Sequence, residues 1–143
     1  AYYHNVANRK GKNIVIAGSG AYAGYVTYWE QPIFVSDAFT VTPFEILDIK
    51  YVFYFLKNIQ DKIHSTKKGS GVPHVHGSSI ANIQIPVPPL EVQEEIVRIL
   101  DCFADYSAEL QAELQARKEQ YEYYRDKLLS FNKIGGGTVA DNE

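Results

Sequence analysis

The sequence has few of the features that define secreted, membrane or disulfide-stabilised proteins. Its 143 residues include one cysteine, Cys102, and no methionine. A single cysteine cannot form an internal disulfide, which fits a reducing cytoplasm, and Cys102 is expected to serve as a small apolar residue of a helix. No apolar run approaches membrane-spanning length, and the first residues do not form a signal-peptide pattern. Because methionine is absent throughout, we expect the chain to be a piece of a longer protein.

The chain also lacks the residue sets that carry most catalysis and metal binding. No nucleophile, base and acid stand at a recognisable spacing. The glycine-rich segment 18–24 invites a phosphate-loop interpretation, but no Gly-Lys-Ser/Thr closes it and strand-like residues follow it. His74 and His76 would lie on one side of a strand without a third ligand at metal-like spacing, so no metal is expected. None of these patterns therefore indicates an enzyme. An enzyme that uses the glycine loop for a phosphorylated substrate is an alternative.

Positive charge is concentrated in one part of the chain. The formal net charge is −3 at pH 7, which taken alone speaks against nucleic acid. Residues 1–90, however, carry eight Lys and Arg, five Asp and Glu and all four histidines, whereas the remainder carries six basic and twelve acidic residues. This division suggests that the first part meets a polyanion and the second meets protein. Charge that only keeps both parts in solution is the alternative.

Short β-prone segments separated by turn residues dominate the first part of the chain. Strands are predicted at residues 13–17, 25–29, 33–35, 38–41 and 83–87. The glycines of segment 18–24 are expected to allow positive-φ backbone between the first two strands. From about Asp48 to His64 the apolar period changes to that of a helix packed on the sheet. Its apolar face consists of Ile49, Val52, Phe53, Leu56, Ile59 and Ile63.

A basic, glycine-rich loop at residues 65–71 is the first candidate for contact with a polyanion. Its backbone donors and the side chains of Lys67 and Lys68 suit phosphate contact. Ser70, His74 and Tyr22 are further candidates for contacts with sugars or base edges, on their loop positions. A solvated loop without a ligand is the alternative.

A long helix is predicted after the two consecutive prolines Pro88 and Pro89. They exclude helical backbone before them, so the helix can begin only from about Pro89. Alternating steps of four and three residues from Ile96 to Phe131 meet an apolar or aromatic side chain everywhere except at Ser107 and Arg117. Arg117 is interpreted as a device that sets register or partner choice, or as the end of the seam. Such a heptad pattern, over a helix of roughly 60 Å, predicts a coiled-coil homodimer, and a single core helix of the same domain is the alternative. The predicted dimerisation residues, called the seam below, are Ile96, Leu100, Phe103, Leu110, Leu114, Tyr121, Tyr124 and Leu128.

Residues 85–101 resemble a junction found in a known family. Their sequence is Ile-Pro-Val-Pro-Pro-Leu-Glu-Val-Gln-Glu-Glu-Ile-Val-Arg-Ile-Leu-Asp. In the DNA-specificity subunits of type I restriction–modification systems, this junction joins a target recognition domain to its spacer helix. Residues 13–24 resemble the family's strand with a glycine-rich loop, and residues 69–80 resemble its segment before the last strand. The resemblance covers about residues 11–131. Compared with the family's pattern, we expect these 143 residues to lack a β-rich stretch before the first strand, a second recognition domain and a second spacer helix.

The resemblance implies an α+β fold in three parts. Residues 1–89 would form a partial, β-rich target recognition domain with a packed helix. Residues 90–131 would form one long coiled-coil spacer and dimerisation helix. From its own composition, the tail at residues 132–143 is expected to be disordered.

The resemblance also implies a function and a set of partners. The chain would recognise a sequence in double-stranded DNA and position a methyltransferase and a nuclease on it, in the cytoplasm. It would itself be non-catalytic and hold no cofactor. S-adenosylmethionine would belong to a methyltransferase subunit, and ATP with magnesium to a restriction subunit. A dimerisation or scaffold fragment that does not read DNA is the alternative.

Overall fold

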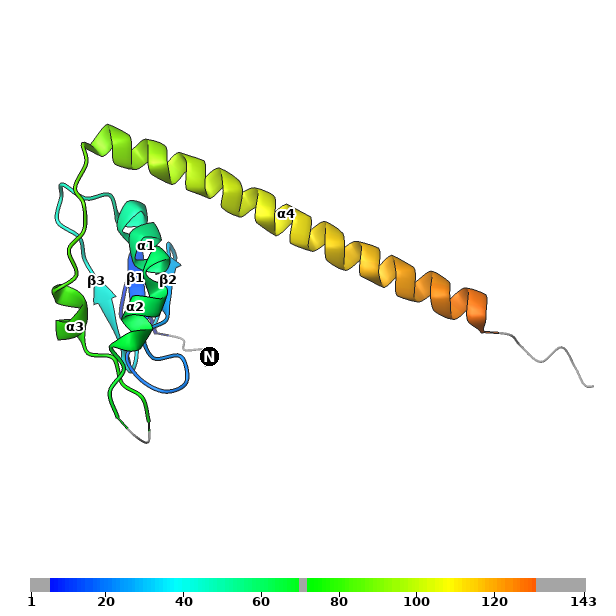
Figure 1. Cartoon of the computed structure of the whole chain (residues 1–143), viewed down its shortest axis with the longest axis horizontal. Coiled ribbons are helices and arrows are strands. Elements are labelled where there is room, and N and C mark those ends of the chain that lie inside the picture. The colour runs from blue at the N-terminus through cyan, green and yellow to red at the C-terminus, as the bar shows by residue number, and fades with distance from the viewer. Residues whose placement is uncertain (1–5, 70–71, 131–143) are drawn as a thin grey trace, which may run out of the picture. The chain divides into compact units, whose positions relative to one another are not determined.

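The computed structural model describes residues 6–69 and 72–130. Ser70, Phe131 and the predicted tail, residues 132–143, lie outside these described residues. The chain divides into two compact units, one ending at Asp101 and the other beginning at Cys102. We call the first of these the globular unit. The elements, labelled in Figure 1, are β1 (Asn13–Ala17), β2 (Val26–Trp29), β3 (Ala38–Val41), α1 (Ile49–Asn58), α2 (Gln60–Ser65), α3 (Gly77–Ala81) and α4 (Leu90–Leu129). The predicted α+β class is confirmed.

A three-stranded antiparallel sheet is the centre of the globular unit. The strand order is β2-β1-β3, so β1 pairs on both sides. Ile14 pairs with Tyr28 of β2 and Val41 of β3. Ile14 and Ile16 are fully buried, and the other three residues of β1 are half-buried, as expected for alternate residues of a central strand. Three of the predicted strands are confirmed, at residues 13–17, 25–29 and 38–41.

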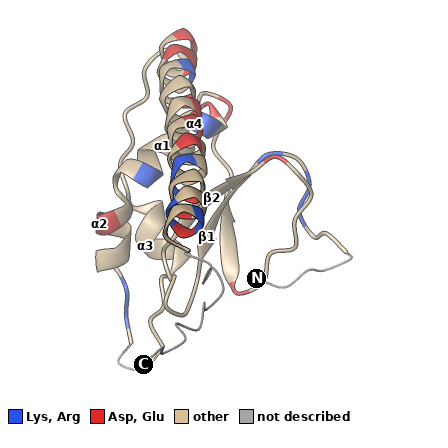
Figure 2. Cartoon of the chain, turned by 90° about the vertical axis from the view of Figure 1, so that its right-hand side faces the viewer, with Lys and Arg blue, Asp and Glu red and all other residues tan. Residues whose placement is uncertain are grey.

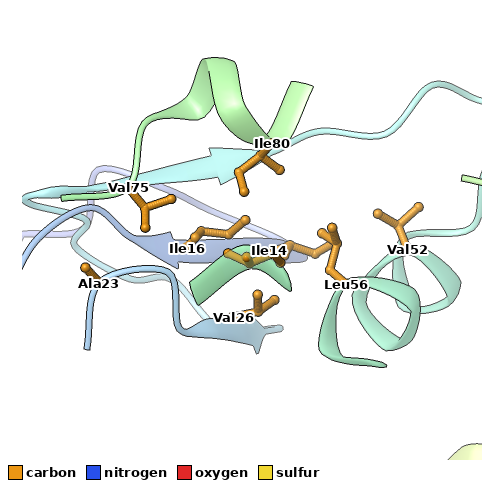
Figure 3. Packing of buried hydrophobic residues seen from close by; sticks show 9 residues of the cluster. Ile14, Ile16, Ala23, Val26, Val52, Leu56, Val75 and Ile80 are labelled. Carbon is orange, nitrogen blue, oxygen red and sulfur yellow. The ribbon is translucent and has the colours of Figure 1, made fainter. Parts of the chain in front are cut away.

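The hydrophobic core lies between this sheet and the helices α1 and α2. Figure 3 shows aliphatic side chains from β1, β2 and α1 converging on one another, joined by Val75 and Ile80 from the later part of the unit. The buried cluster is Ile14, Ile16, Ala23, Val26, Val52, Leu56, Ile63, Val75 and Ile80. Burial of one such side chain stabilises a fold by about 1.5–3 kcal/mol, so this cluster is the main source of stability of the unit.

The helix predicted over residues 48–64 forms, but as two helices. The backbone of Ile59, at φ −101° and ψ 23°, ends α1 and precedes α2. The carboxylate of Asp48 accepts a hydrogen bond of 2.9 Å from the N–H of Tyr51 and so caps the start of α1. The predicted apolar face is confirmed, because all six of its residues belong to the core cluster or pack against it.

The strand predicted at residues 33–35 is wrong. Ile33 makes only an isolated antiparallel bridge with Arg9. The side-chain amide of Asn8 then takes the place of a neighbouring strand: its Nδ2 donates to the carbonyl of Val35 at 2.8 Å, and its Oδ1 accepts from the N–H of Val35 at 2.7 Å.

The strand predicted at residues 83–87 is also wrong. Ile83 and Ile85 do pack against the core, and the residues between and after them are exposed, which explains the strand-like pattern. The backbone, however, joins no sheet among the described residues. Pro86 has no N–H to donate to a neighbouring strand, which disfavours sheet pairing here.

The predicted long helix is confirmed as α4, which has 40 residues. The carbonyl of Pro89 accepts hydrogen bonds from the N–H groups of Val92 and Gln93, at 3.0 and 3.1 Å, so the helix begins directly after the proline pair. Cys102 lies exposed in α4. No helix in the described residues is long and apolar enough to cross a membrane.

Candidate nucleic-acid interface

Three chain segments that are distant in sequence meet where β1 ends. Segment 72–76 lies between the glycine-rich segment 18–24 and the chain that follows α2. His74 and Lys68 exchange two backbone hydrogen bonds of 2.9 Å, and His74 forms a second antiparallel bridge with Ser19. Because these bridges are single residue pairs and α3 begins directly after residue 76, the strand expected to present His74 and His76 together does not form. We call the three joined segments the loop cluster.

Glycine makes the close approach of these segments possible. Gly20 and Gly24 have φ angles of 79° and 82°, as predicted for the turn between β1 and β2. A Cβ on Gly24 would lie 3.1 Å from methyl groups of both Ile63 and Val75. A larger residue would therefore strain the backbone and push α2 and segment 72–76 away from the loop.

The structure brings most of the predicted DNA-binding residues into the loop cluster. Lys68 and His74 are exposed, Lys67 is half-buried and Tyr22 is 75% exposed. Ser70 lies outside the described residues. The backbone donors expected to meet phosphate are already used, because the N–H of Lys67 donates to His64 and that of Lys68 donates to His74. Any phosphate contact of these two residues therefore falls to their ammonium groups.

Two residues that the sequence analysis did not single out extend this surface. The rings of Tyr22 and Tyr25 meet edge to face, with centroids 6.5 Å apart. The ammonium group of Lys57 lies 4.0 Å from the centre of the Tyr25 ring. Cations beside exposed aromatic rings are the combination that contacts phosphates and stacks on bases. The sequence signal was weak, because Lys57 lies on a helix and Tyr25 precedes a strand.

One acidic residue contributes to the loop cluster. The hydroxyl of Ser19 donates a hydrogen bond to the carboxylate of Asp37, and the carbonyl of Asp37 accepts one of 2.9 Å from the N–H of Gly18. Asp37 has a φ of 52° and is the only described residue other than glycine with a positive φ. Its bonds tie the end of β1 to the start of β3, so its role here is to hold the cluster together. No group of three or more His, Cys, Asp or Glu side chains within the described residues could hold a metal.

Gln93 attaches the first turn of α4 to the rest of the globular unit. Its side chain is fully buried, although glutamine is usually exposed. The Oε1 atom accepts a hydrogen bond of 2.8 Å from the N–H of Asp48, and Nε2 donates to the carbonyls of Ile46 and Pro88, at 2.9 and 2.8 Å. Both donors and the oxygen are therefore used. No role for Gln93 could be predicted from the sequence, because its partners Ile46 and Asp48 lie far away in the chain.

Asp101 makes a second attachment two turns later. Its carboxylate accepts a hydrogen bond of 2.7 Å from the ammonium group of Lys50 and one of 2.6 Å from the hydroxyl of Tyr54. Burial alone raises the pKa of Asp101, but the hydrogen bonds from Lys50 and Tyr54 outweigh it and lower the pKa overall. Tyr28 lies nearby, and its pKa is raised by burial and by its hydrogen bond to Glu30. The base of α4 is thus held by a buried amide and an ion pair.

The seam residues lie open along α4. Of the eight, only Ile96 is half-buried, and the exposed fractions of the others run from 37% for Leu100 to 71% for Leu128. Acidic and basic residues both occur along the helix (Figure 2). The hydroxyl of Ser107 donates to the carbonyl of Phe103 in the same helix, and Arg117 lies 3.4 Å from the carboxylate of Glu113. An exposed apolar stripe of this length is typical of a helix that pairs with another.

Comparisons with known proteins agree on one family. Residues 2–120 match the family described as type I restriction modification DNA specificity domain. The chain is 38% identical over 114 residues to the EcoR124I/EcoR124II specificity subunit of Escherichia coli, a match that covers 66% of this chain and 28% of the relative. It is 30% identical over 122 residues to the MjaVIII specificity subunit of Methanocaldococcus jannaschii, covering 82% and 28%.

A solved structure shares the fold. The type I restriction-modification system S subunit from M. genitalium superposes with a TM-score of 0.66 at 21% identity, over 93% of this chain and 36% of the other. At this identity the likeness shows the fold alone. The chain spans about 28% of the length of the two curated relatives.

Proposed function

The chain belongs to the type I restriction modification DNA specificity domain family, and from this premise we propose that it recognises a sequence in double-stranded DNA as part of a restriction–modification complex. The family resemblance seen in residues 85–101 is thereby confirmed. The observation that supports DNA reading by this chain is the loop cluster. Separate segments there present cations, an imidazole and exposed tyrosines on one surface.

Some residues of the loop cluster would contact the phosphate backbone of DNA, and others would contact its sugars and bases. Lys67 and Lys68 would meet phosphates, which position a protein on DNA without reading its sequence. His74 and Tyr22 are exposed polar and aromatic groups that can reach sugars or base edges. A base edge in the major groove distinguishes all four base pairs, so a few such contacts are enough for specificity.

Catalysis would lie outside this chain. The family members to which it is similar are specificity subunits by name. We propose that methylation, with S-adenosylmethionine, belongs to a methyltransferase subunit and that ATP-driven cleavage with magnesium belongs to a restriction subunit. The chain itself would hold no cofactor. Such a complex would act on cellular DNA in the cytoplasm.

The open seam supports a homodimer through α4. Each exposed seam residue would lose its water contact on pairing with a second helix, which favours association. Two globular units would then be held at a fixed separation, each able to contact one half of a two-part DNA target.

Selection of DNA from a randomised duplex pool tests the proposed function. The full chain, mixed with its methyltransferase partner, should enrich one sequence over successive rounds. The K67A/K68A variant should recover the same sequence with lower yield, because lysine–phosphate contacts carry affinity but not specificity. If the pool stays random while the complex still assembles, the chain is a dimerisation or scaffold module that does not read DNA.

A further inference from the structure

A second basic surface lies at the other end of the sheet from the loop cluster. We propose that Arg9, Lys10 and Lys12, here called the basic turn, bind the phosphate backbone of double-stranded DNA as a second anchor. The inference rests on the proposed function, because it names a further contact with the same DNA. All three residues are exposed. Figure 2 shows basic residues both in the chain before β1 and in the chain after α2.

The backbone of the basic turn is held in place. Gly11 has a φ of 71°, which allows the chain to reverse. The side-chain amide of Asn13 donates to the carbonyls of Lys10 and Gly11, at 3.1 and 2.8 Å. Arg9 and Ile33 exchange two backbone hydrogen bonds of 3.0 Å. A ligand that binds here therefore has to order the side chains but not the backbone, which lowers the entropic cost of binding.

The ammonium groups of Lys10 and Lys12 are exposed, and Nη1 of Arg9 donates a hydrogen bond of 2.9 Å to the carbonyl of Asn8. In the part of the chain that the structure describes, none of Arg9, Lys10 and Lys12 forms an ion pair with a carboxylate. Glu30 follows β2 at this end of the sheet, and its Oε1 accepts a hydrogen bond from the hydroxyl of Tyr28. The three positive charges of the basic turn therefore outnumber the single negative charge of Glu30.

The two basic surfaces lie far enough apart to border a groove of DNA on its two sides. The basic turn precedes Asn13, the first residue of β1, and the loop cluster begins after Ala17, its last residue. At about 3.4 Å per residue, β1 is about 14 Å long, and the two surfaces lie beyond its opposite ends. The major groove is about 12 Å wide. One surface can therefore contact the strand on one side of the groove while the other contacts the opposite strand.

The salt dependence of binding to a duplex of random sequence tests this inference, because phosphate contacts do not require the target sequence. Affinities of the full chain are measured by fluorescence anisotropy between about 50 and 200 mM salt. The K10Q/K12Q variant removes two charges and should flatten the slope of log affinity against log salt by about 1.8. The K10R/K12R variant keeps both charges and should keep the wild-type slope. K67A/K68A, in the loop cluster, should flatten the slope independently, and the two effects should add.

The variants separate failure of this inference from failure of the proposed function. If K67A/K68A flattens the slope but K10Q/K12Q does not, the loop cluster binds DNA and the basic turn does not. If K10R/K12R loses as much slope as K10Q/K12Q, the loss comes from a disturbed turn, and the inference is overturned. If the wild-type chain shows no salt-dependent binding, neither surface contacts DNA.

Discussion

The side-chain oxygen of Gln93 accepts a hydrogen bond of 2.8 Å from the backbone N–H of Asp48, and this bond joins the first turn of α4 to the start of α1. The two residues are far apart in sequence. The amide of Gln93 is fully buried, and the carboxylate of Asp48 caps α1. One amide therefore attaches the first turn of α4 to the rest of the globular unit.

Replacement of Gln93 by leucine should destabilise the globular unit. The variant leaves the N–H of Asp48 and the carbonyls of Ile46 and Pro88 without their partner, and we expect a loss of about 2–4 kcal/mol in the free energy of unfolding. Urea unfolding followed by circular dichroism measures it. Q115L provides the control, since Gln115 is exposed on the same helix. That control should change stability by less than about 0.5 kcal/mol. Equal losses in both variants would contradict the account of Gln93.

Replacement of Asp101 by asparagine should destabilise the unit in a pH-dependent way. The hydrogen bonds from Lys50 and Tyr54 lower the folded pKa of Asp101 despite its burial, so the ionised carboxylate favours the folded state. This contribution is full above the unfolded pKa of about 3.9 and is lost as pH falls through the folded pKa. Because the pair is about one third exposed, we expect a loss of only about 1 kcal/mol at pH 7.

Chemical denaturation of wild type and D101N between about pH 7 and pH 2 tests whether the stability contribution of the Asp101 carboxylate is lost on acidification. The stability difference between them should shrink on acidification below the unfolded pKa. D105N, at an exposed position on the same helix, is the control and should show no such convergence. A difference that grows in acid would mean that the carboxylate does not favour the folded state.

The pattern of correct and wrong predictions has a physical explanation in particular residues. Ile14 and Ile16 could be placed in a central strand from the sequence, because alternation and burial are local properties of a strand. The hydrogen bonds of Asn8 to Val35 and of Gln93 to Asp48 could not be predicted from the sequence, because each depends on a side chain meeting a distant part of the backbone. Lys57 was not predicted as a candidate for the same reason, because its ammonium group meets the ring of Tyr25, which is distant in sequence.

Introducing charge into the seam should separate the dimer. L110K/L114K places two unpaired lysines in the helix contact, at a cost on the order of several kcal/mol, and should give monomers in sedimentation velocity. A108K/A112K adds the same charge at exposed positions outside the seam and should remain dimeric. If L110K/L114K sediments as the wild type does, the seam is not the dimer contact.

Removal of the two lysines in the loop cluster should weaken binding to every duplex alike. K67A/K68A should reduce the salt slope by up to about 1.8, equivalent to two phosphate contacts. The backbone bridge between Lys68 and His74 does not involve the lysine side chain, so the fold should persist. K67R/K68R keeps the charge and serves as the control. An unchanged affinity and slope in K67A/K68A would mean that these lysines are only solvated.

The central claim is that this chain reads a DNA sequence as part of an assembly. The globular unit has few basic residues and α4 is acidic, so an isolated chain should bind weakly, whereas a partner adds phosphate contacts and a dimer joins two weak sites. The most direct test is a titration of the selected duplex and of a scrambled duplex, at physiological salt, with and without the methyltransferase subunit. We predict weak and equal binding by the chain alone, and tight binding of the selected duplex only when the subunit is present. Sequence-specific nanomolar binding by the isolated chain, or equal binding of both duplexes by the complex, would contradict the account.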